Sequence, residues 1–137
     1  MEARGRLAGR HALLTGAGGG IGLAVTAAFL AEGARCTAID LAAAASGGIA
    51  ALIERHGDRL AYAAADITRI AALDGLVGGA AQRFGTVDLL FNNAAVFDLA
   101  PLLDSGEAMY ERLFAVNVKG MFFVMQKVLA QMVAQRS

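Results

Sequence analysis

The stretch "TGAGGGIG", residues 15–22, decides how the sequence around it folds. Five of its eight residues are glycine. It follows a short apolar run, "RHALLT" at 10–15, and leads into an alanine-rich segment with helical periodicity that ends at Gly33. In a βαβ unit, a glycine loop at this position binds a diphosphate, because the first N–H groups and the positive dipole end of the helix face the anion.

The spacing of the glycines differs from two common phosphate-binding patterns. G-x-G-x-x-G would need glycine at position 21 or 23, where Ile21 and Leu23 stand, and no lysine follows as a P-loop requires. Gly16, Gly20 and Gly22 instead give G-x-x-x-G-x-G. We expect Gly16 to make a tight turn, Gly20 to let the backbone approach a diphosphate, and Gly22 to let the helix pack on the strand. The alternative is that the loop is only a flexible βα turn, and the loop alone does not distinguish this interpretation from diphosphate binding.

Strand-like and helical segments alternate along the rest of the chain. The predicted strands are 10–15, 35–40, 60–66 and 87–91, and the predicted helices are 20–32, 42–55, 70–84 and 106–134. Asp104 and Glu107 have the spacing of a capping box at the start of the last helix. Four β–α units with short links require a parallel sheet with right-handed crossovers. The predicted fold class is therefore α/β, a Rossmann-like doubly wound parallel sheet truncated after the fourth β–α unit, in one domain over 1–137 that is incomplete at its C-terminus.

Composition argues against several classes of protein. With 57% hydrophobic and 18% charged residues among 137, the chain has the content of a folded core. A formal net charge of zero without a basic block argues against a nucleic-acid or membrane surface. Cys36 is the only cysteine, so neither a disulfide nor a thiolate metal site is predicted, and His11 and His56 are expected to be surface or loop histidines. No apolar segment reaches the ~18 residues of a membrane span, and we expect a cytoplasmic protein.

Asp40 makes the diphosphate interpretation more specific. It ends the second predicted strand, where an acidic side chain accepts hydrogen bonds from the ribose of an adenosine. Leu41 follows it and Ala17, Gly18 and Gly19 fill the loop, so no cation is at hand for the 2′-phosphate of NADP. This favours NAD. Asp40 also has a structural alternative, as the N-cap of the helix predicted from position 42.

The glycine loop resembles that of the short-chain dehydrogenase/reductase family, which is spelled T-G-x-x-x-G-I-G. It matches at Thr15, Gly16, Gly20, Ile21 and Gly22. Three further matches follow in order on the expected elements. They are Asp66 within "ADIT", "NNAA" at 92–95, which is similar to the family's N-N-A-G with Ala95 in place of glycine, and Asn117 within "FAVNVKG".

The resemblance implies an NAD-dependent oxidoreductase and assigns a role to each matching position. The implied cofactor contacts are Gly16, Gly20, Ile21, Gly22, Asp40, Leu41, Asp66, Ile67, Asn93, Ala94 and Ala95. Asp66 corresponds to an aspartate beside the adenine ring, and one asparagine of Asn92 and Asn93 to a residue that stabilises the sheet. Asn117 corresponds to a catalytic asparagine whose backbone carbonyl holds a water in a proton relay. An amide that is hydrogen-bonded within the core is the alternative for Asn117.

The stretch "NNAAVFDLAPLLD" at 92–104 also resembles the sorbitol (polyol) dehydrogenases of the family. The resemblance implies an alcohol or polyol substrate, and it places Val96, Phe97 and Asp98 where they influence substrate choice. Phe97 and Leu99 as core residues beneath a loop are the alternative. Leu113, Val116, Phe123, Val124 and Val128 make the last helix broadly apolar, and with the family's packing of this helix they predict a homo-oligomer of the full-length protein.

The family's Y-x-x-x-K pair is missing from these residues. Tyr62 is followed four residues later by Asp66, and Tyr110 by Phe114, while Lys119 and Lys127 have no tyrosine four residues before them and are expected to be solvated. Ser137 is the last residue, and the family's serine lies on a later strand. We therefore interpret the chain as the N-terminal part of a dehydrogenase, inactive alone. A non-catalytic dinucleotide-binding module and another enzyme on the same fold, such as a nucleotide-sugar epimerase, are the alternatives.

Overall fold

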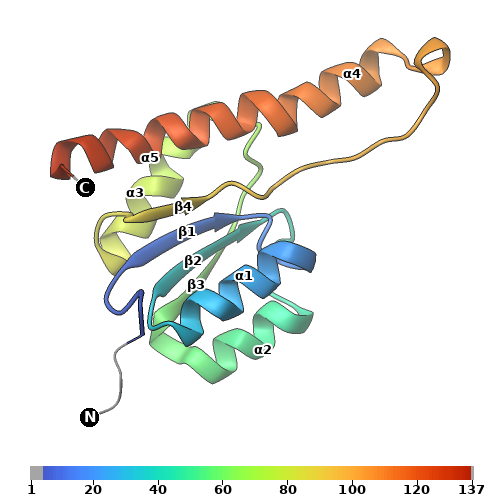
Figure 1. The fold of residues 1–137 in the computed structure, drawn as a ribbon. Helices are drawn as coiled ribbons and strands as arrows, with labels where there is room; N and C mark the ends of the chain where they lie inside the picture. Colours follow the sequence, from blue (N-terminus) through green and yellow to red (C-terminus); the bar gives the residue numbers. More distant parts are fainter. Residues whose placement is uncertain (1–4, 137) are drawn as a thin grey trace.

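The computed structural model describes residues 5–136, and Ser137 lies outside them. A parallel sheet of four strands, in the order β3-β2-β1-β4, forms the centre (Figure 1). Its strands are β1 (His11–Thr15), β2 (Arg35–Asp40), β3 (Leu60–Ala64) and β4 (Leu89–Phe91). The buried strands β1 and β2 have the bounds that their apolar runs predict to within a residue. β4 pairs with β1 alone and lies at the edge of the sheet.

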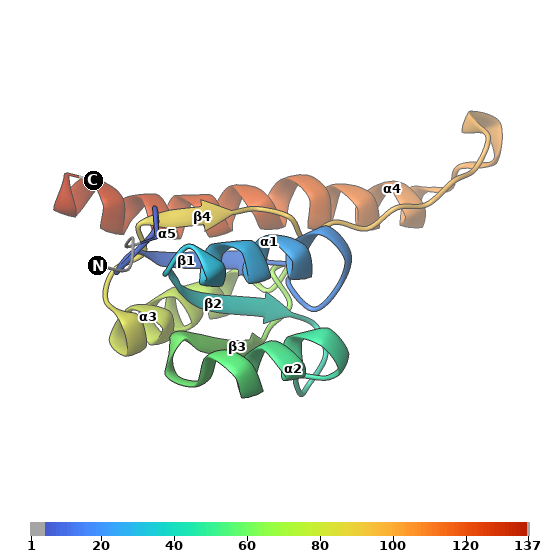
Figure 2. The ribbon, with the colours of Figure 1, turned by 60° about the horizontal axis from the view of Figure 1, so that its bottom comes forward.

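Helices cover both faces of the sheet. Helices α1 (Gly20–Ala31) and α2 (Gly47–His56) lie on one face, and α3 (Leu73–Phe84) and α5 (Met121–Gln135) on the other (Figures 1 and 2). The alternation of strand side chains divides the core accordingly: Ala12 and Leu14 pack in the cluster with α1, and Leu13 packs in the cluster with α3 and α5. The predicted α/β fold of the Rossmann type is confirmed.

The segment between β2 and α2 differs from the prediction. The sequence predicts a helix from position 42, but α2 begins at Gly47; residues 41–44 form bends, and residues 45–46 have no regular secondary structure. Asp40 accepts a hydrogen bond from the N–H of Leu41, and the hydroxyl of Tyr62 donates to the carbonyl oxygen of Ala42. These contacts hold Leu41 and Ala42 in a non-helical conformation. Asp40 is therefore not the N-cap of α2, and that alternative is wrong.

Two glycines allow close packing, one between two helices and the other between a helix and a loop. A Cβ at Gly48 would lie 2.4 Å from Leu23 Cδ2, so its absence lets α2 approach α1. A Cβ at Gly120 would lie 2.9 Å from Ile67 Cγ1, so its absence lets the last helix approach the loop after β3. Neither contact is visible in the local pattern of the sequence.

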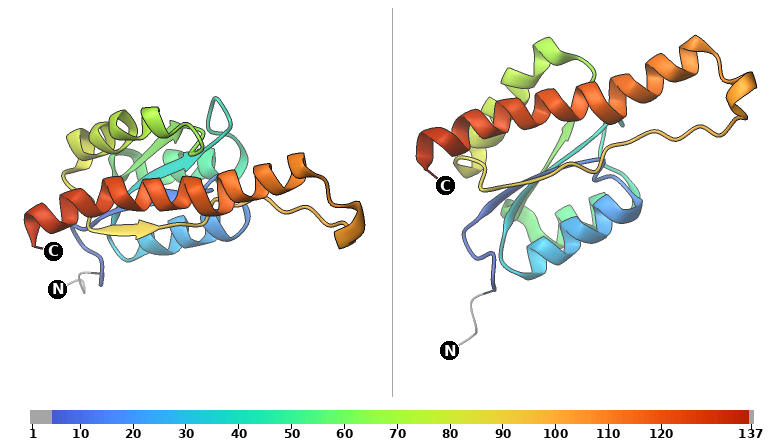
Figure 3. Two further views of the ribbon diagram at one scale, coloured as in Figure 1. Left: turned by 90° about the horizontal axis from the view of Figure 1, so that it is seen from above. Right: turned by 45° about the horizontal axis from the view of Figure 1, so that its top comes forward.

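The last helix has the predicted extent but an unpredicted interruption. It consists of α4 (Glu107–Phe114), a π-helical segment (Ala115–Gly120) and α5, which run on as one long helix (Figure 3). Single-turn π segments inside α-helices are frequently found at functional sites. The predicted capping box is wrong, because the N-cap is Gly106, no side chain among the described residues caps the helix, and Asp104 lies in a 3₁₀ turn (Leu102–Asp104).

The connection between β4 and α4 extends away from the sheet. It turns at the 3₁₀ segment and returns as α4, so that both run beyond the carboxyl ends of the strands (Figures 1 and 3). Phe97 and Leu99 are 81% and 87% exposed, and their assignment as core residues is wrong. Asp98 forms an ion pair with Arg112 of α4, which joins the two sides of this excursion.

Two titratable side chains lie elsewhere than expected. His11 is buried in β1, where its Nδ1 lies 2.7 Å from the Gly85 carbonyl oxygen and its Nε2 lies 2.9 Å from Thr37 Oγ1. It is therefore a core residue and not a surface histidine. Lys127 was expected to be solvated, but its Nζ lies 3.1 Å from the carboxylate of Asp74 on α3. Lys119 is exposed, as expected.

The span from Glu107 to Gln135 is long and apolar enough to cross a membrane by length and composition. The expectation that no segment reaches this length is wrong for this helix. One side of it packs against the sheet, where Val124 and Val128 are fully buried. Several of its other apolar side chains are exposed, among them Phe114, Val118, Phe122 and Val133.

Candidate functional site

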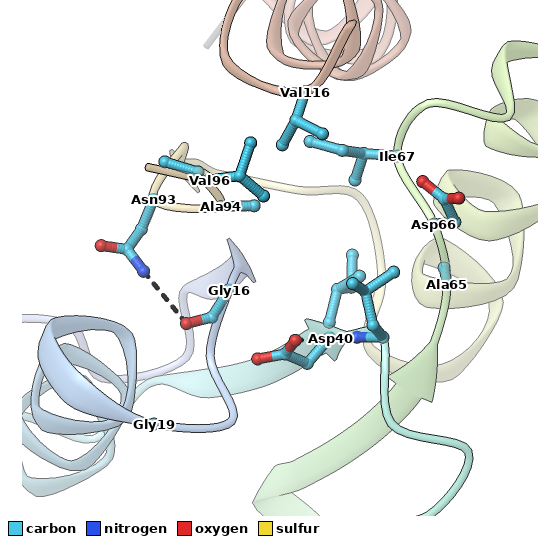
Figure 4. A pocket seen from close by; sticks show the side chains of 13 residues that line it. Gly16, Gly19, Asp40, Ala65, Asp66, Ile67, Asn93, Ala94, Val96 and Val116 are labelled. Atoms are coloured by element: carbon cyan, nitrogen blue, oxygen red, sulfur yellow. Dashed lines mark hydrogen bonds between the residues drawn. The ribbon is translucent and has the colours of Figure 1, made fainter. Parts of the chain in front are cut away.

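A cavity of about 310 Å³ lies where the carboxyl ends of the strands meet (Figure 4). Ligands bind at this edge of open α/β sheets, at the point where the strand order reverses. Here β1 leads to α1 on one face and β4 to the long helix on the other, so β1 and β4 flank that point. The residues that line the cavity are Gly16, Gly19, Ile39, Asp40, Leu41, Ala65, Asp66, Ile67, Asn93, Ala94, Ala95, Val96 and Val116.

Most of the predicted cofactor contacts meet in this cavity. Those that line it are Gly16, Asp40, Leu41, Asp66, Ile67, Asn93, Ala94 and Ala95. Gly20, Ile21 and Gly22 form the first turn of α1, beside the cavity, and Ile21 is 71% exposed. Sequence reasoning missed Gly19, Ile39, Ala65 and Val116. Their only signal was their position next to a predicted residue.

The glycine loop has the conformation that its spacing predicts. Gly16 has a φ of +65°, and a Cβ on it would lie 2.9 Å from Ala94 Cα, so the turn needs glycine for both reasons. A Cβ at Gly22 would lie 2.0 Å from the carbonyl oxygen of Gly16. The start of α1 can pack on the end of β1 only because position 22 has no side chain.

Thr15 joins the glycine loop to the segment after β4. Its Oγ1 accepts hydrogen bonds from the N–H groups of Asn93 and Ala94, both at 3.1 Å. Asn93 Nδ2 donates in turn to the carbonyl oxygen of Gly16 at 3.0 Å, the contact drawn in Figure 4. Thr15 was predicted as part of a motif but not as a residue of the site. These three bonds explain why a hydroxyl and an amide are needed where the two strands separate.

Asp40 is held by two main-chain donors. Its Oδ2 accepts the N–H of Gly18 at 2.7 Å, and its Oδ1 accepts the N–H of Leu41 at 2.8 Å. Lysine and arginine are absent from the described residues that line the cavity, although Arg69 lines an adjoining hollow together with Leu41 and Asp66. The Asp40 carboxylate thus faces a cavity whose described lining carries no cationic side chain.

Asp66 is oriented by its own loop. The hydroxyl of Thr68 donates to Asp66 Oδ1 at 2.7 Å, and the N–H of Thr68 donates to the same oxygen at 2.9 Å. These two hydrogen bonds, the hydroxyl's first, lower the pKa of the Asp66 carboxyl. Asp66 is therefore ionised at neutral pH, and Oδ2 is left to accept a further hydrogen bond.

Asn117 makes a pair of hydrogen bonds to the backbone of one residue. Its Oδ1 accepts the N–H of Val96 and its Nδ2 donates to the carbonyl oxygen of Val96, both at 2.8 Å. The amide therefore fixes the chain after "NNAA" against the π-helical segment. The structural alternative for this side chain, an amide hydrogen-bonded within the core, agrees with these two bonds, although Asn117 itself is half-buried. Asn117 lies beside the cavity, between Val116 and the exposed Val118.

Asn92 differs from its neighbour. Its Oδ1 is buried and has no hydrogen-bond partner among the described residues. Asn92 follows β4 at the edge of the sheet and borders a groove between β4 and α5 that is also lined by Leu89, Met125 and Met132. A buried acceptor without a donor is destabilising, so this edge has one unmet hydrogen bond.

Groups for proton transfer and metal binding are few in residues 5–136. The hydroxyl of Tyr62 is bonded to Ala42, away from the cavity lining, and the ring of Tyr110 stacks on Phe114 at 4.4 Å. No group of three or more His, Cys, Asp or Glu side chains in this part of the chain has the geometry of a metal site. The described site can bind and orient a ligand through glycines, carboxylates and amides.

Comparisons with known proteins agree with this geometry. The profile of the family described as short chain dehydrogenase matches residues 10–137. Sorbitol dehydrogenase of Cereibacter sphaeroides is 43% identical over 129 residues, which are 94% of this chain and 49% of the relative. Galactitol 2-dehydrogenase of Agrobacterium fabrum is 41% identical over 130 residues, 95% of this chain and 50% of the relative. The chain therefore spans about half the length of the curated relatives that it matches.

Solved structures share the fold. A short-chain dehydrogenase/reductase described as a glucose/ribitol dehydrogenase from Brucella melitensis superposes with a TM-score of 0.83 at 29% identity, over 94% of this chain and 54% of its own. A protein from Novosphingobium aromaticivorans described as a short-chain dehydrogenase superposes with a TM-score of 0.88 at 25% identity, over 93% and 48% of the two chains. With the profile match over most of its residues and polyol dehydrogenases among its relatives, the chain belongs to the short-chain dehydrogenase family.

Proposed function

We propose that the chain is the cofactor-binding part of an NAD-dependent dehydrogenase that oxidises a secondary alcohol or a polyol, such as sorbitol, to the ketone. The observation that carries this proposal is the meeting of the glycine loop, Asp40 and Asp66 around one cavity at the carboxyl ends of the strands. Family membership supports the reaction class, an oxidation of a CH–OH group.

The residues around the cavity fit a dinucleotide. The N–H groups of the first turn of α1, at Gly20, Ile21 and Gly22, have no acceptor within the helix and suit a diphosphate. Asp40 suits the ribose hydroxyls, because each of its oxygens already has one main-chain donor and keeps a lone pair. Asp66 Oδ2 suits a donor on the adenine ring.

The remaining cofactor contacts are apolar or backbone groups. Leu41 and Ile67 follow the two aspartates and offer apolar contact to the adenine. Asn93, Ala94 and Ala95 would form the wall of the cavity behind the ribose. The hydrogen bonds from Asn93 and Ala94 to Thr15 hold this wall in position. The charge at Asp40 favours NAD, since a 2′-phosphate would be repelled by the carboxylate and finds no lysine or arginine among the described lining residues.

The nicotinamide of the cofactor would supply the hydride acceptor. In the proposed mechanism Asn117 holds a water at its backbone carbonyl and thereby feeds a proton relay. Its side chain keeps Val96, and with it the wall of the cavity, in position against the helix. In the family a hydroxyl, a phenol and an ammonium group move the proton, and no Y-x-x-x-K pair is present in these 137 residues.

The proposal extends to substrate, assembly and location. The names of two relatives, sorbitol dehydrogenase and galactitol 2-dehydrogenase, support a polyol substrate. The exposed apolar side chains of the long helix support a homo-oligomer, a dimer or a tetramer, of the full-length protein. A cytoplasmic location suits a cofactor that is regenerated by metabolism. The alternative function, a dinucleotide-binding module without catalysis, shares the binding site and differs only in turnover.

A titration followed by NMR tests the binding site. On addition of NAD, chemical shifts should change at residues 16–22, 40–41, 66–67 and 93–95, and less so on addition of NADP. Asp40→Ala should weaken NAD binding by about ten- to a hundredfold, because charge-assisted hydrogen bonds contribute ~1.5–3 kcal/mol. Arg69→Gln is the control and should leave the preference between the two cofactors unchanged. Tighter binding of NADP than of NAD by the unmodified chain would contradict the proposal.

A second experiment separates the enzyme from the non-catalytic module. A longer form of the protein that contains a Y-x-x-x-K pair should reduce NAD in the presence of sorbitol or galactitol. Binding of NAD without turnover by such a longer form would favour the module. The readout is the absorbance of NADH.

A further inference from the structure

Two consecutive main-chain donors join the glycine loop to the end of β2. The N–H of Ala17 donates to the carbonyl oxygen of Ile39 at 3.1 Å, and the N–H of Gly18 donates to Asp40 Oδ2 at 2.7 Å. The N–H of Gly18 is therefore directed at the carboxylate and not at a diphosphate. The N–H of position 18 thus bonds to Asp40, and the N–H groups of the first turn of α1 are the ones left to bind an anion.

A side chain at position 18 would collide with the side chain of Asp40. A Cβ there would lie 2.7 Å from Oδ2, 3.2 Å from Cγ and 3.4 Å from Cβ of Asp40, and these are the three heavy atoms nearest to it. Gly18 is not among the glycines with positive φ, so an alanine would meet no backbone strain. A side chain at position 18 could therefore be accommodated only if the Asp40 carboxylate moved from the place that it occupies.

We propose that Gly18 is a positioning residue for the ribose of the dinucleotide: its N–H and its missing side chain together hold the Asp40 carboxylate toward the cavity. The inference rests on the proposed function. An alanine at position 18 leaves the backbone in place and displaces the carboxylate, so the ribose loses an oriented pair of acceptors. The preference for NAD then depends on the pair of residues 18 and 40, and not on the aspartate alone.

A double-mutant cycle tests this role. NAD and NADP affinities are measured by NMR titration for the unmodified chain, Gly18→Ala, Asp40→Ala and the double variant. Gly18→Ala should weaken NAD binding about tenfold, which corresponds to the loss of one charge-assisted hydrogen bond between Asp40 and the ribose. It should also lower the ratio of the affinity for NAD to the affinity for NADP. In the Asp40→Ala background the same change should have no further effect. Gly78→Ala, on α3, is the control, because its Cβ meets no heavy atom of the described residues within 4 Å.

A measurement without ligand separates the inference from the proposed function. The amide proton of Gly18 should exchange slowly and lie downfield in the unmodified chain, and Asp40→Ala should abolish both properties. NAD binding with additive losses in the cycle would overturn the positioning role and leave the proposed function standing. A chain that shows the amide signature but binds no NAD would overturn both. A Gly18 amide that does not respond to Asp40→Ala would remove the contact on which the inference is built.

Discussion

At the scale of single residues, main-chain hydrogen bonds determine where the polar side chains of the cavity lie. Asp40 and Asp66 accept N–H groups of the loops beside them, and Asn117 pairs with both backbone groups of Val96. Such bonds are made within the protein before a ligand arrives. The site is consequently preorganised, which lowers the entropy that binding would cost.

Thr15→Val should destabilise the fold more than its size suggests. The change preserves volume and removes the acceptor of two N–H groups, Asn93 and Ala94, and unmet buried donors cost about 1–3 kcal/mol. Thr26→Val is the matched control: Thr26 is fully buried as well, but its hydroxyl donates to the carbonyl oxygen of Gly22 in its own helix. The free energies of unfolding in urea give the comparison. Equal losses for the two variants would contradict the role of Thr15.

At the scale of elements, the two ends of the sheet serve different purposes. The carboxyl ends carry the cavity, whereas the amino ends are closed by packing around His11. Its ring contacts Phe84 edge to face at 5.4 Å, and its nitrogens bond to Gly85 and Thr37. Because a carbonyl accepts at Nδ1, the ring carries its proton there and Nε2 accepts the hydroxyl of Thr37.

His11 should make the stability of the sheet depend on pH. Burial lowers the pKa of its imidazole, while Gly85, Asp88 and Thr86 oppose this and Arg35 adds to it. The folded chain therefore binds the proton less readily than the unfolded chain. The free energy of unfolding should be constant above the ordinary histidine pKa of ~6.5 and should fall as the pH falls below it.

Urea unfolding at several pH values between 7.5 and 5.5 measures this dependence. His11→Gln should lose the part of the slope that belongs to His11. The pKa of His56 is also lowered, by burial first and then by Arg59 and Arg55, so His56→Gln should remove its own part of the slope and retain that of His11. The lowered pKa of Asp66 acts only at more acidic pH, below its ordinary range. An unchanged slope in His11→Gln would show that the buried ring is not the source.

The long helix presents two apolar sides. Val124 and Val128 are fully buried against the sheet, whereas Phe114, Val118, Phe122 and Val133 are exposed. The prediction of an apolar surface larger than the sheet needs is borne out in outline, but Leu113, Val116 and Phe123, which were named for it, are half-buried. A different set of side chains therefore forms the exposed surface.

Two neighbouring phenylalanines should separate stability from self-association. Phe122 is 52% exposed, while Phe123 packs against the buried cluster of α3 and α5. Phe123→Ala should lower the free energy of unfolding by about 2–3 kcal/mol, at or just below the ~3–5 kcal/mol of a fully buried aromatic residue, because Phe123 is half-buried. Phe122→Ala should change it little and should shift the protein toward smaller species in light scattering at micromolar concentration. A strictly monomeric full-length protein without substitutions would contradict the proposed oligomer.

At the scale of the whole molecule, the sheet has an open side. β4 lies at its edge, Asn92 Oδ1 has no partner among the described residues, and an apolar groove of about 350 Å³ runs between β4 and α5. An edge strand with unpaired N–H and C=O groups favours association with other chains. The matched relatives are about twice as long as this chain.

The 137-residue chain should bind NAD weakly, be poorly soluble, and leave sorbitol unoxidised. The contacts described here cover the adenosine and diphosphate end of the cofactor, and no Y-x-x-x-K pair is present in the sequence. Calorimetric titration with NAD and the absorbance of NADH with sorbitol measure the two properties, with a known sorbitol dehydrogenase as the positive control. Turnover that co-purifies with this chain would mean that another residue replaces the tyrosine.

Local patterns were sufficient for the fold class and for most of the residues around the cavity. Apolar runs that end at Thr15, Asp40 and Phe91 predict strands of a parallel sheet, and the carboxyl ends of such strands share one edge. The glycines and aspartates that follow those strands therefore had to lie close together. This inference needs only the order of the elements, and the order is written in hydrophobic periodicity and glycine positions.

Contacts between distant residues decided the rest. The start of α2 depends on Tyr62 and Ala42, the burial of His11 on Thr37, and the orientation of Asn117 on Val96, pairs separated by 20, 26 and 21 residues. The close contact of Gly18 is likewise with Asp40, 22 residues away. Periodicity and capping signals act over a few residues, so they report element type, whereas a hydrogen bond across the fold exists only once the sheet has brought its partners together. The sequence alone therefore predicted most of the residues that border the cavity, and the tertiary structure decided what holds each of them there.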